Sequence, residues 1–152
     1  MGFFDKLKGA MNAVTGGAAK VTIELVQPCV FPGEECGVRI TATSTGAEIK
    51  SKGVYVDFKG VEEVKFKDDQ QAGKEVTKSH TTIDQEFLLS GAFVLAANES
   101  KTWEGAFRLP PTVLPSFAGA IASHKCFIRG RIEAFGNDPD SGYQPVKVGA
   151  KA

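Results

Sequence analysis

The stretch GVYVDFKG, residues 53–60, decides the fold class of this chain. Apolar side chains occupy its even positions, at Val54, Val56 and Phe58, and amphipathic or charged side chains occupy the odd ones. Successive side chains of a β-strand point to opposite faces, so this alternation predicts a strand with one face in the core. Glu62 then breaks the pattern of apolar even positions, which predicts a bend or bulge near Gly60.

The apolar face resumes beyond this glycine at Val64 and Phe66. Polar sequence without a period follows, and we expect residues 68–79 to form a long exposed loop. Two pairs of acids, Glu62-Glu63 and Asp68-Asp69, are expected to keep an exposed sheet edge soluble.

Alternation of the same kind recurs along the rest of the chain, with turn signals such as Pro32-Gly33 between the segments. The expected strands lie at residues 21–26, 38–43, 80–89, 93–97, 103–109, 126–134 and 143–148. Many short strands of this kind are typical of an antiparallel β-sandwich or a barrel. The expected core residues are Val54, Val56, Phe58, Trp103, Phe107, Ile128 and Ile132.

An amphipathic helix is predicted before the strands begin. Residues 2–15 place their apolar side chains within an arc of roughly 120°, and Gly16-Gly17 provides a stop. We therefore expect an N-terminal amphipathic helix at residues 1–17 and a single β-sandwich domain at residues 18–152. The candidate interaction residues on the helix are Phe3, Phe4, Leu7, Met11 and Val14. They are expected to pack on their own domain, on a protein partner or second copy, or on a membrane surface.

Charge and cysteine content limit the function classes. The chain has 152 residues, with 18 basic and 18 acidic side chains and no net charge. That balance argues against nucleic acid as a partner, because nucleic-acid binders need a dense basic surface. The three cysteines are an odd number and no export signal is recognisable, so we expect free thiols and a cytoplasmic location. No apolar run reaches the ~18–20 residues of a membrane-spanning helix.

The sequence motifs do not indicate an enzyme. His124 and Cys126 would share one strand face, but no ligand pair has zinc-finger spacing, so we expect a surface histidine beside a buried thiol. Residues 138–142 match part of a calcium loop, and we expect a solvated acidic turn there. Ser116 does not lie in a nucleophile elbow. We assign no catalytic, cofactor-binding or metal-binding residue and expect no cofactor.

One ordered series of motifs resembles a known family. The series consists of PGE at 32–34, the strand at 53–60 that ends in glycine, WEGAF at 103–107, LP at 109–110, LPSF at 114–117 and CFIRGRI at 126–132. This order resembles the amino-terminal lobe of the arrestin-like proteins. The opening stretch, with Phe3-Phe4 and Lys6, resembles the bacterial sporulation-control branch of that group.

The resemblance implies an immunoglobulin-like, two-sheet β-sandwich that binds proteins and carries out no chemistry. The leading hypothesis is therefore a non-enzymatic scaffold or adaptor, a regulatory role included. The alternative is a small-ligand or carbohydrate-binding sandwich, for which Tyr55, Trp103 and Tyr143 would have to offer exposed rings. Because arrestin-like proteins usually carry two lobes, we also expect a homodimer in which a second copy replaces the other lobe.

Overall fold

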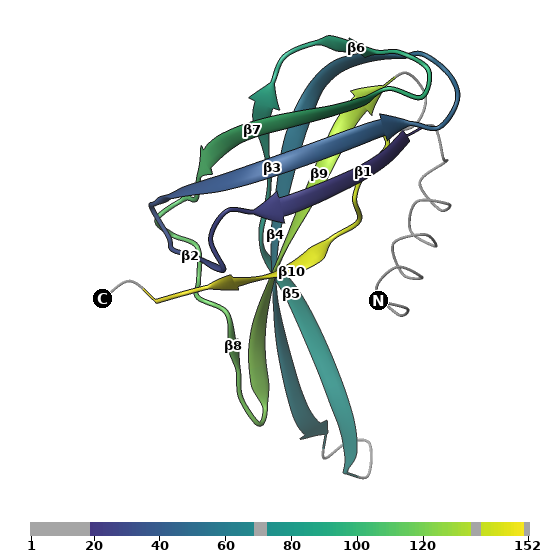
Figure 1. Ribbon diagram of the computed structural model, residues 1–152. Helices are drawn as coiled ribbons and strands as arrows, with labels where there is room; N and C mark the ends of the chain where they lie inside the picture. Colours follow the sequence, from purple (N-terminus) through teal and green to yellow (C-terminus); the bar gives the residue numbers. More distant parts are fainter. Residues whose placement is uncertain (1–18, 69–72, 135–137, 151–152) are drawn as a thin grey trace.

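A computed structural model describes residues 19–68, 73–134 and 138–150, and all of its regular structure is β (Figure 1). The strands in chain order are β1 (Ala19–Leu25), β2 (Cys29–Val30), β3 (Glu35–Ser44), β4 (Ile49–Asp68), β5 (Lys74–Ser90), β6 (Phe93–Leu95), β7 (Ser100–Arg108), β8 (Phe117–Ala118), β9 (Ala122–Ala134) and β10 (Gln144–Val148). The predicted helix at residues 1–17 lies outside the described residues.

The strands form two sheets of unequal size. The smaller sheet has the order β1-β3-β7, and the larger has the order β2-β10-β9-β4-β5, with β6 also paired to β4 and β8 to β9. The smaller sheet lies across the upper part of the larger one in the view of Figure 1. Neighbouring strands are antiparallel except β2 and β10, which pair in parallel over two residues. The prediction of an all-β, two-sheet sandwich is confirmed.

The core lies between the sheets and consists of the predicted alternating faces. Val54, Val56 and Phe58 of β4 are fully buried, and Ile40 of β3 faces them from the smaller sheet. Gly130 allows this close approach, because a Cβ there would lie 3.2 Å from the side chain of Ile40. The predicted core residues Phe107, Ile128 and Ile132 are also buried. Trp103 is only partly buried, against Phe93 at a ring-centroid distance of 4.5 Å, because it lies on the edge strand β7.

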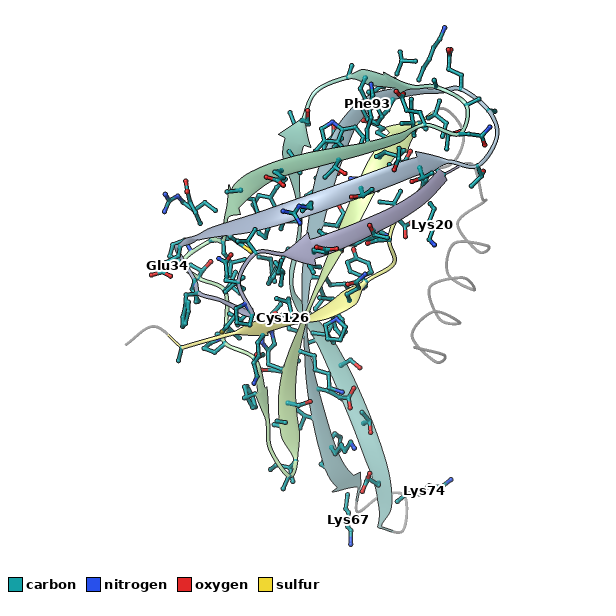
Figure 2. The ribbon with its side chains drawn as sticks, in the orientation of Figure 1. Lys20, Glu34, Lys67, Lys74, Phe93 and Cys126 are labelled. Atoms are coloured by element: carbon teal, nitrogen blue, oxygen red, sulfur yellow. The ribbon has the colours of Figure 1, made fainter. Side chains whose placement is uncertain are left out.

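The predicted loop at 68–79 is wrong over most of its length. Strand β4 continues to Asp68 and β5 begins at Lys74, so the two form a long antiparallel arm. Lys67 and Lys74 lie at the far end of this arm (Figure 2). The arm extends beyond the smaller sheet, so within the described residues that sheet covers neither face of its far end, and the β5 half of the arm, at residues 74–79, lacks apolar alternation. Phe66 is accordingly 40% exposed although it continues the apolar face of β4.

Two further details of β4 were predicted in part. A register shift between β4 and β5 occurs at Gly60/Val61, which confirms the bulge expected at Gly60. Glu62 and Glu63 were expected at an exposed sheet edge, and this prediction is wrong. Their strand β4 is flanked by β5 on one side and by β9 on the other.

Candidate interaction site

The candidate site surrounds residues 82–86 of β5, here called the β5 edge segment. Strand β5 lies at the end of the larger sheet, and within the described residues it pairs only with β4. A hollow lies on each face of the sheet at this point. The two hollows share Asp84 and Gln85 in their linings, so the edge of the strand separates them.

The outer hollow lies on the face of the larger sheet that points away from the smaller sheet. It has a volume of about 640 Å³ and is lined almost entirely by polar side chains. Its base is an ionic cluster around Asp57, which is 7% exposed. Arg129 Nη2 lies 2.8 Å from Asp57 Oδ2, and Arg131 Nε lies 3.0 Å from the same oxygen. The strand register explains the cluster, because Asp57 is directly opposite Arg129 on β9 and Glu86 on β5.

The segment that follows β9 completes the cluster. Asp138 Oδ2 accepts a hydrogen bond from Arg131 at 3.1 Å, and Asp140 Oδ2 lies 3.8 Å from Arg129 Nη1. The expectation of a solvated acidic turn at 138–142 is therefore wrong, because two arginines on the adjacent strand face hold these carboxylates. Hydrogen bonds to Asp57, above all, raise the pKa of the Arg131 guanidinium, so Arg131 stays charged throughout the accessible pH range.

The outer hollow is acidic overall. Its lining contains five carboxylates, from Asp57, Asp84, Glu86, Asp138 and Asp140, against the guanidinium groups of Arg129 and Arg131. The ion pairs of Arg131 include one with Glu86, but within the described residues Asp84 has no ion-pair partner. Lys59 lies directly opposite Asp84 in the β4–β5 register, and its single positive charge reduces the surplus without cancelling it.

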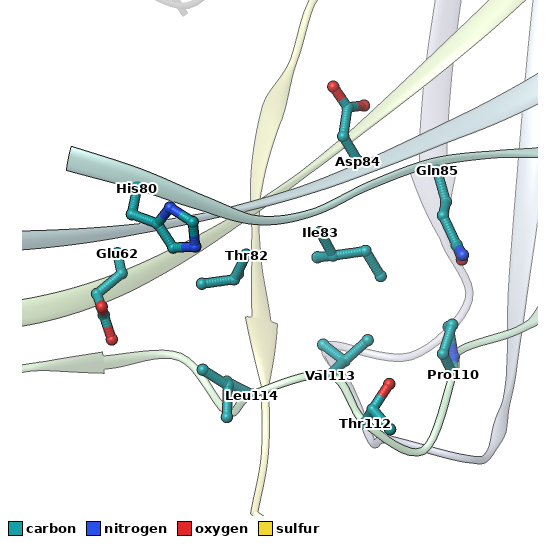
Figure 3. A pocket seen from close by; sticks show the side chains of 10 residues that line it. All are labelled: Glu62, His80, Thr82, Ile83, Asp84, Gln85, Pro110, Thr112, Val113 and Leu114. Atoms are coloured by element: carbon teal, nitrogen blue, oxygen red, sulfur yellow. The ribbon is translucent and has the colours of Figure 1, made fainter.

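The inner hollow lies on the opposite side of the β5 edge segment and has a volume of about 650 Å³. Figure 3 shows Ile83 and Gln85 of β5 pointing toward Pro110, Val113 and Leu114, which form the facing wall. Leu114 is 45% exposed, whereas Val113 is buried. The hollow therefore combines a polar strand edge with an aliphatic wall.

A buried histidine fixes that wall in place. His124 of β9 is 1% exposed, so the prediction of a surface histidine is wrong. Its Nδ1 donates to the carbonyl oxygen of Pro115 at 3.0 Å, and its Nε2 shares a hydrogen bond with the Thr82 hydroxyl at 2.7 Å. This ring thereby connects β5 to the segment after β7. The neighbouring thiol of Cys126 is buried, as predicted.

The wall is also hydrogen-bonded to strand β10 through Ser116. The Ser116 amide donates to the Val148 carbonyl at 2.9 Å, and the Val148 amide donates to Ser116 Oγ at 3.0 Å. Ser116 thus joins the wall to β10.

The rings required by a carbohydrate-binding alternative are each in contact with another side chain of the protein. Arg131 lies over Tyr55 at 4.7 Å and Arg129 lies over Tyr143 at 4.5 Å from the ring centroids. Trp103 packs against Phe93. A sugar-stacking platform needs open ring faces, and these contacts reduce the ring surface that remains for one.

The candidate residues proposed from the sequence, Phe3, Phe4, Leu7, Met11 and Val14, all lie outside the described residues. The hollows beside β5 were not predicted from the sequence. The charged positions of β4 and β9 were recognised as one strand face each, but only the register reveals that Asp57 lies between Arg129 and Glu86.

The described residues contain no group of three or more His, Cys, Asp and Glu side chains arranged to hold a metal ion. They also contain no helix of sufficient length and apolarity to cross a membrane.

Comparison with known proteins identifies the fold. The structure is similar to the crystal structure of Spo0M, a sporulation control protein from Bacillus subtilis, with a TM-score of 0.63 and 22% sequence identity. The similarity covers 89% of this chain and 51% of the Spo0M chain, so this chain spans about half the length of that protein. No family model matches the sequence, and no curated protein matches it. The predicted resemblance to the arrestin-like sporulation-control group is confirmed at the level of the fold.

Proposed function

We propose that this protein is a non-enzymatic scaffold or adaptor that acts by binding other proteins, in a regulatory role. The observation that carries the proposal is the edge of β5, which has no strand partner within the described residues and lies between two hollows in a fold shared with a sporulation control protein. An unpaired strand edge offers backbone donors and acceptors to another polypeptide. The polar side chains beside it, such as Arg131 and His124, have partners within the protein, which supports a binding surface rather than a reaction centre.

The proposal extends to location and assembly. We place the protein in the cytoplasm, where its three thiols, all free in the structure, would stay reduced. A homodimer and contact of the N-terminal segment with a membrane surface remain part of the proposal, with protein as the principal partner.

Capture of partners by the immobilised full-length protein tests this function. We expect one or a few proteins from the native lysate to be retained in near-stoichiometric amount, released by excess free protein and insensitive to nuclease. Glycan arrays and thermal-shift screens with metabolites serve as the parallel measurement. Saturable binding of a sugar or metabolite, with no protein retained, would overturn the proposal.

A further inference from the structure

We propose that the β5 edge segment, residues 82–86, binds an extended segment of a partner protein in which basic and aliphatic side chains alternate. This inference rests on the proposed function and specifies the chemistry of the partner. The added segment would extend the larger sheet beyond β5.

The first argument is the edge itself. Strand β5 runs from Lys74 to Ser90, and alternate backbone N–H and C=O groups along it point away from β4. Within the described residues these groups have no strand partner, whereas an edge of this length is normally paired or blocked. Side chains at the β5 edge segment leave room for such pairing, because the hollows lie against it on both sides.

The second argument is the position of those hollows relative to the strand. Asp84 points to the opposite side of the β5 ribbon from Ile83 and Gln85 (Figure 3). A strand added here would likewise direct its alternate side chains to opposite faces. One set would enter the outer hollow and the other would enter the inner hollow, so the two linings specify two different kinds of side chain.

The outer hollow selects basic side chains. Asp57 is already paired with two arginines, but Asp84 has no ion pair within the described residues and Glu86 is largely exposed. A lysine or arginine projecting from the added strand would reach these two carboxylates at the edge. Asp140 and the remaining negative surplus of the hollow would favour the same charge.

The inner hollow selects aliphatic side chains. Ile83 lines it from the strand, and Val113 and Leu114 line it from the opposite wall. Leu114 is 45% exposed, so covering it would remove apolar surface from water. The hydrogen bonds of His124 to Thr82 and to the Pro115 carbonyl hold the two walls in fixed positions, which reduces the ordering cost of binding.

A second copy of β5 fits this edge poorly. Twofold antiparallel pairing centred on Gln85 would place Asp84 opposite Glu86 of the other copy, and like charges directly opposite each other are destabilising. A partner with basic residues would instead be complementary on this face.

A labelled synthetic peptide that alternates lysine and valine is the probe for the test, measured by fluorescence anisotropy with the full-length protein. Two peptides serve as controls: one with the same composition in blocks, and one with glutamate in place of lysine. We expect the alternating lysine peptide to bind at least about tenfold more tightly than either control, and more weakly as salt is raised. Equal binding of all three peptides would overturn the proposal.

Backbone methylation tests the pairing geometry directly. In a paired strand, the N–H groups of alternate residues point to the same neighbour. N-methylation of one alternating set of peptide residues should therefore abolish binding, while N-methylation of the other set should leave it within about twofold. Loss of binding in neither case, or an equal loss in both, would exclude strand addition.

Protein variants locate the site. Asp84→Lys should weaken binding of the lysine peptide about two- to tenfold and strengthen binding of the glutamate peptide, whereas Glu48→Lys, which makes the same charge change at an exposed position outside both linings, should not. Leu114→Ala should also weaken binding, and Val94→Ala, at a similar exposure of 48%, should not. Thermal melts of all four variants confirm that they fold.

Two results separate this inference from the broader function. In the first, lysate capture retains a partner that excess lysine–valine peptide does not displace and that the Asp84→Lys variant still binds. The adaptor role would then stand, but the β5 edge segment would not be the binding site. If the protein without peptide is a dimer that Asp84→Lys strengthens, as expected when the charge opposite Glu86 of the other copy is reversed, a second copy is the occupant and the peptide proposal fails.

Discussion

Asp57 is the residue on which the outer face of the larger sheet depends. Its carboxylate is almost fully buried and accepts hydrogen bonds from both Arg129 and Arg131. Burying charges is costly, and here the cost is offset only because each guanidinium finds a carboxylate within hydrogen-bonding distance. Removing the central carboxylate would leave two neighbouring cations that are balanced only by the carboxylates at the rim of the cluster, those of Glu86, Asp138 and Asp140.

The first prediction follows from this arrangement. We expect Asp57→Asn to lower the free energy of unfolding by about 3 kcal/mol, because its amide nitrogen would face one of the guanidinium groups. Glu104→Gln is the matched control, since Glu104 pairs with Arg39 at 2.9 Å on the exposed surface and should cost less than about 1 kcal/mol. Urea unfolding measures both, and equal losses would show that burial does not strengthen the Asp57 cluster.

The second prediction concerns two thiols and pH. Burial raises the pKa of Cys36 and of Cys126 from 9.0 to about 11. Between pH 9 and pH 11 the unfolded chain has lost these protons while the folded chain retains them, so unfolding releases protons and stability falls as the pH rises. Each thiol should account for a loss of about 2 kcal/mol across this window and for none below it.

Urea unfolding at several pH values from 8 to 11 checks this effect. The control is the double variant Cys36→Ala/Cys126→Ala, in which lysines and tyrosines still titrate. Its stability should fall less steeply with pH than that of the unchanged protein. Parallel pH dependences would show that the thiols contribute nothing.

At the scale of the elements, the β4 bulge positions the candidate site. Gly60 lies opposite Ile83 on β5 and Cys126 on β9, at the point where the β4–β5 register shifts. A Cβ at this position would lie 2.7 Å from Thr82 Oγ1 and 3.0 Å from His124 Nε2. The glycine therefore makes room for the hydrogen bond that ties β5 to the inner wall.

The third prediction tests that role. Gly60→Ala should destabilise the protein by about 1–3 kcal/mol, because the methyl group must displace Thr82 or His124. Gly91→Ala, with no atom within 4 Å of the new Cβ, should change stability by less than about 1 kcal/mol. Calorimetric melts decide the point, and a Gly60→Ala variant as stable as Gly91→Ala would mean that the strand adjusts around the methyl group.

Alternation in the sequence predicted the strands that have one covered face, such as the 53–60 segment of β4. It did not predict the start of β5, because residues 74–79 lie in an arm with both faces in solvent and carry no apolar period. It also misplaced His124, whose neighbours are polar and whose burial arises from the segment after β7. The outer hollow depends on the register between strands distant in sequence, which one sequence does not specify.

The whole molecule is asymmetric, because the smaller sheet covers only part of the larger one (Figure 1). Large apolar side chains remain exposed on the described surface, among them Val26 at 74%, Ile121 at 67% and Phe117 at 49%. Such side chains are available to a covering segment, a second copy or another surface.

The fourth prediction concerns the N-terminal segment, which supplies the apolar residues Phe3, Phe4, Leu7, Met11 and Val14. A helix this short is marginal in water and must pack on something, most often the domain to which it belongs. We therefore expect deletion of residues 1–17 to lower the midpoint of urea unfolding or to cause aggregation, and Leu7→Ser in the full chain to act in the same direction with a smaller effect. If the midpoint is unchanged but light scattering shows that a dimer is lost, the segment packs on a second copy. If the midpoint is unchanged but binding to anionic vesicles is lost, the segment packs on a membrane. If stability, mass and vesicle binding all stayed the same, the amphipathic face would have no binding partner and the prediction would be wrong.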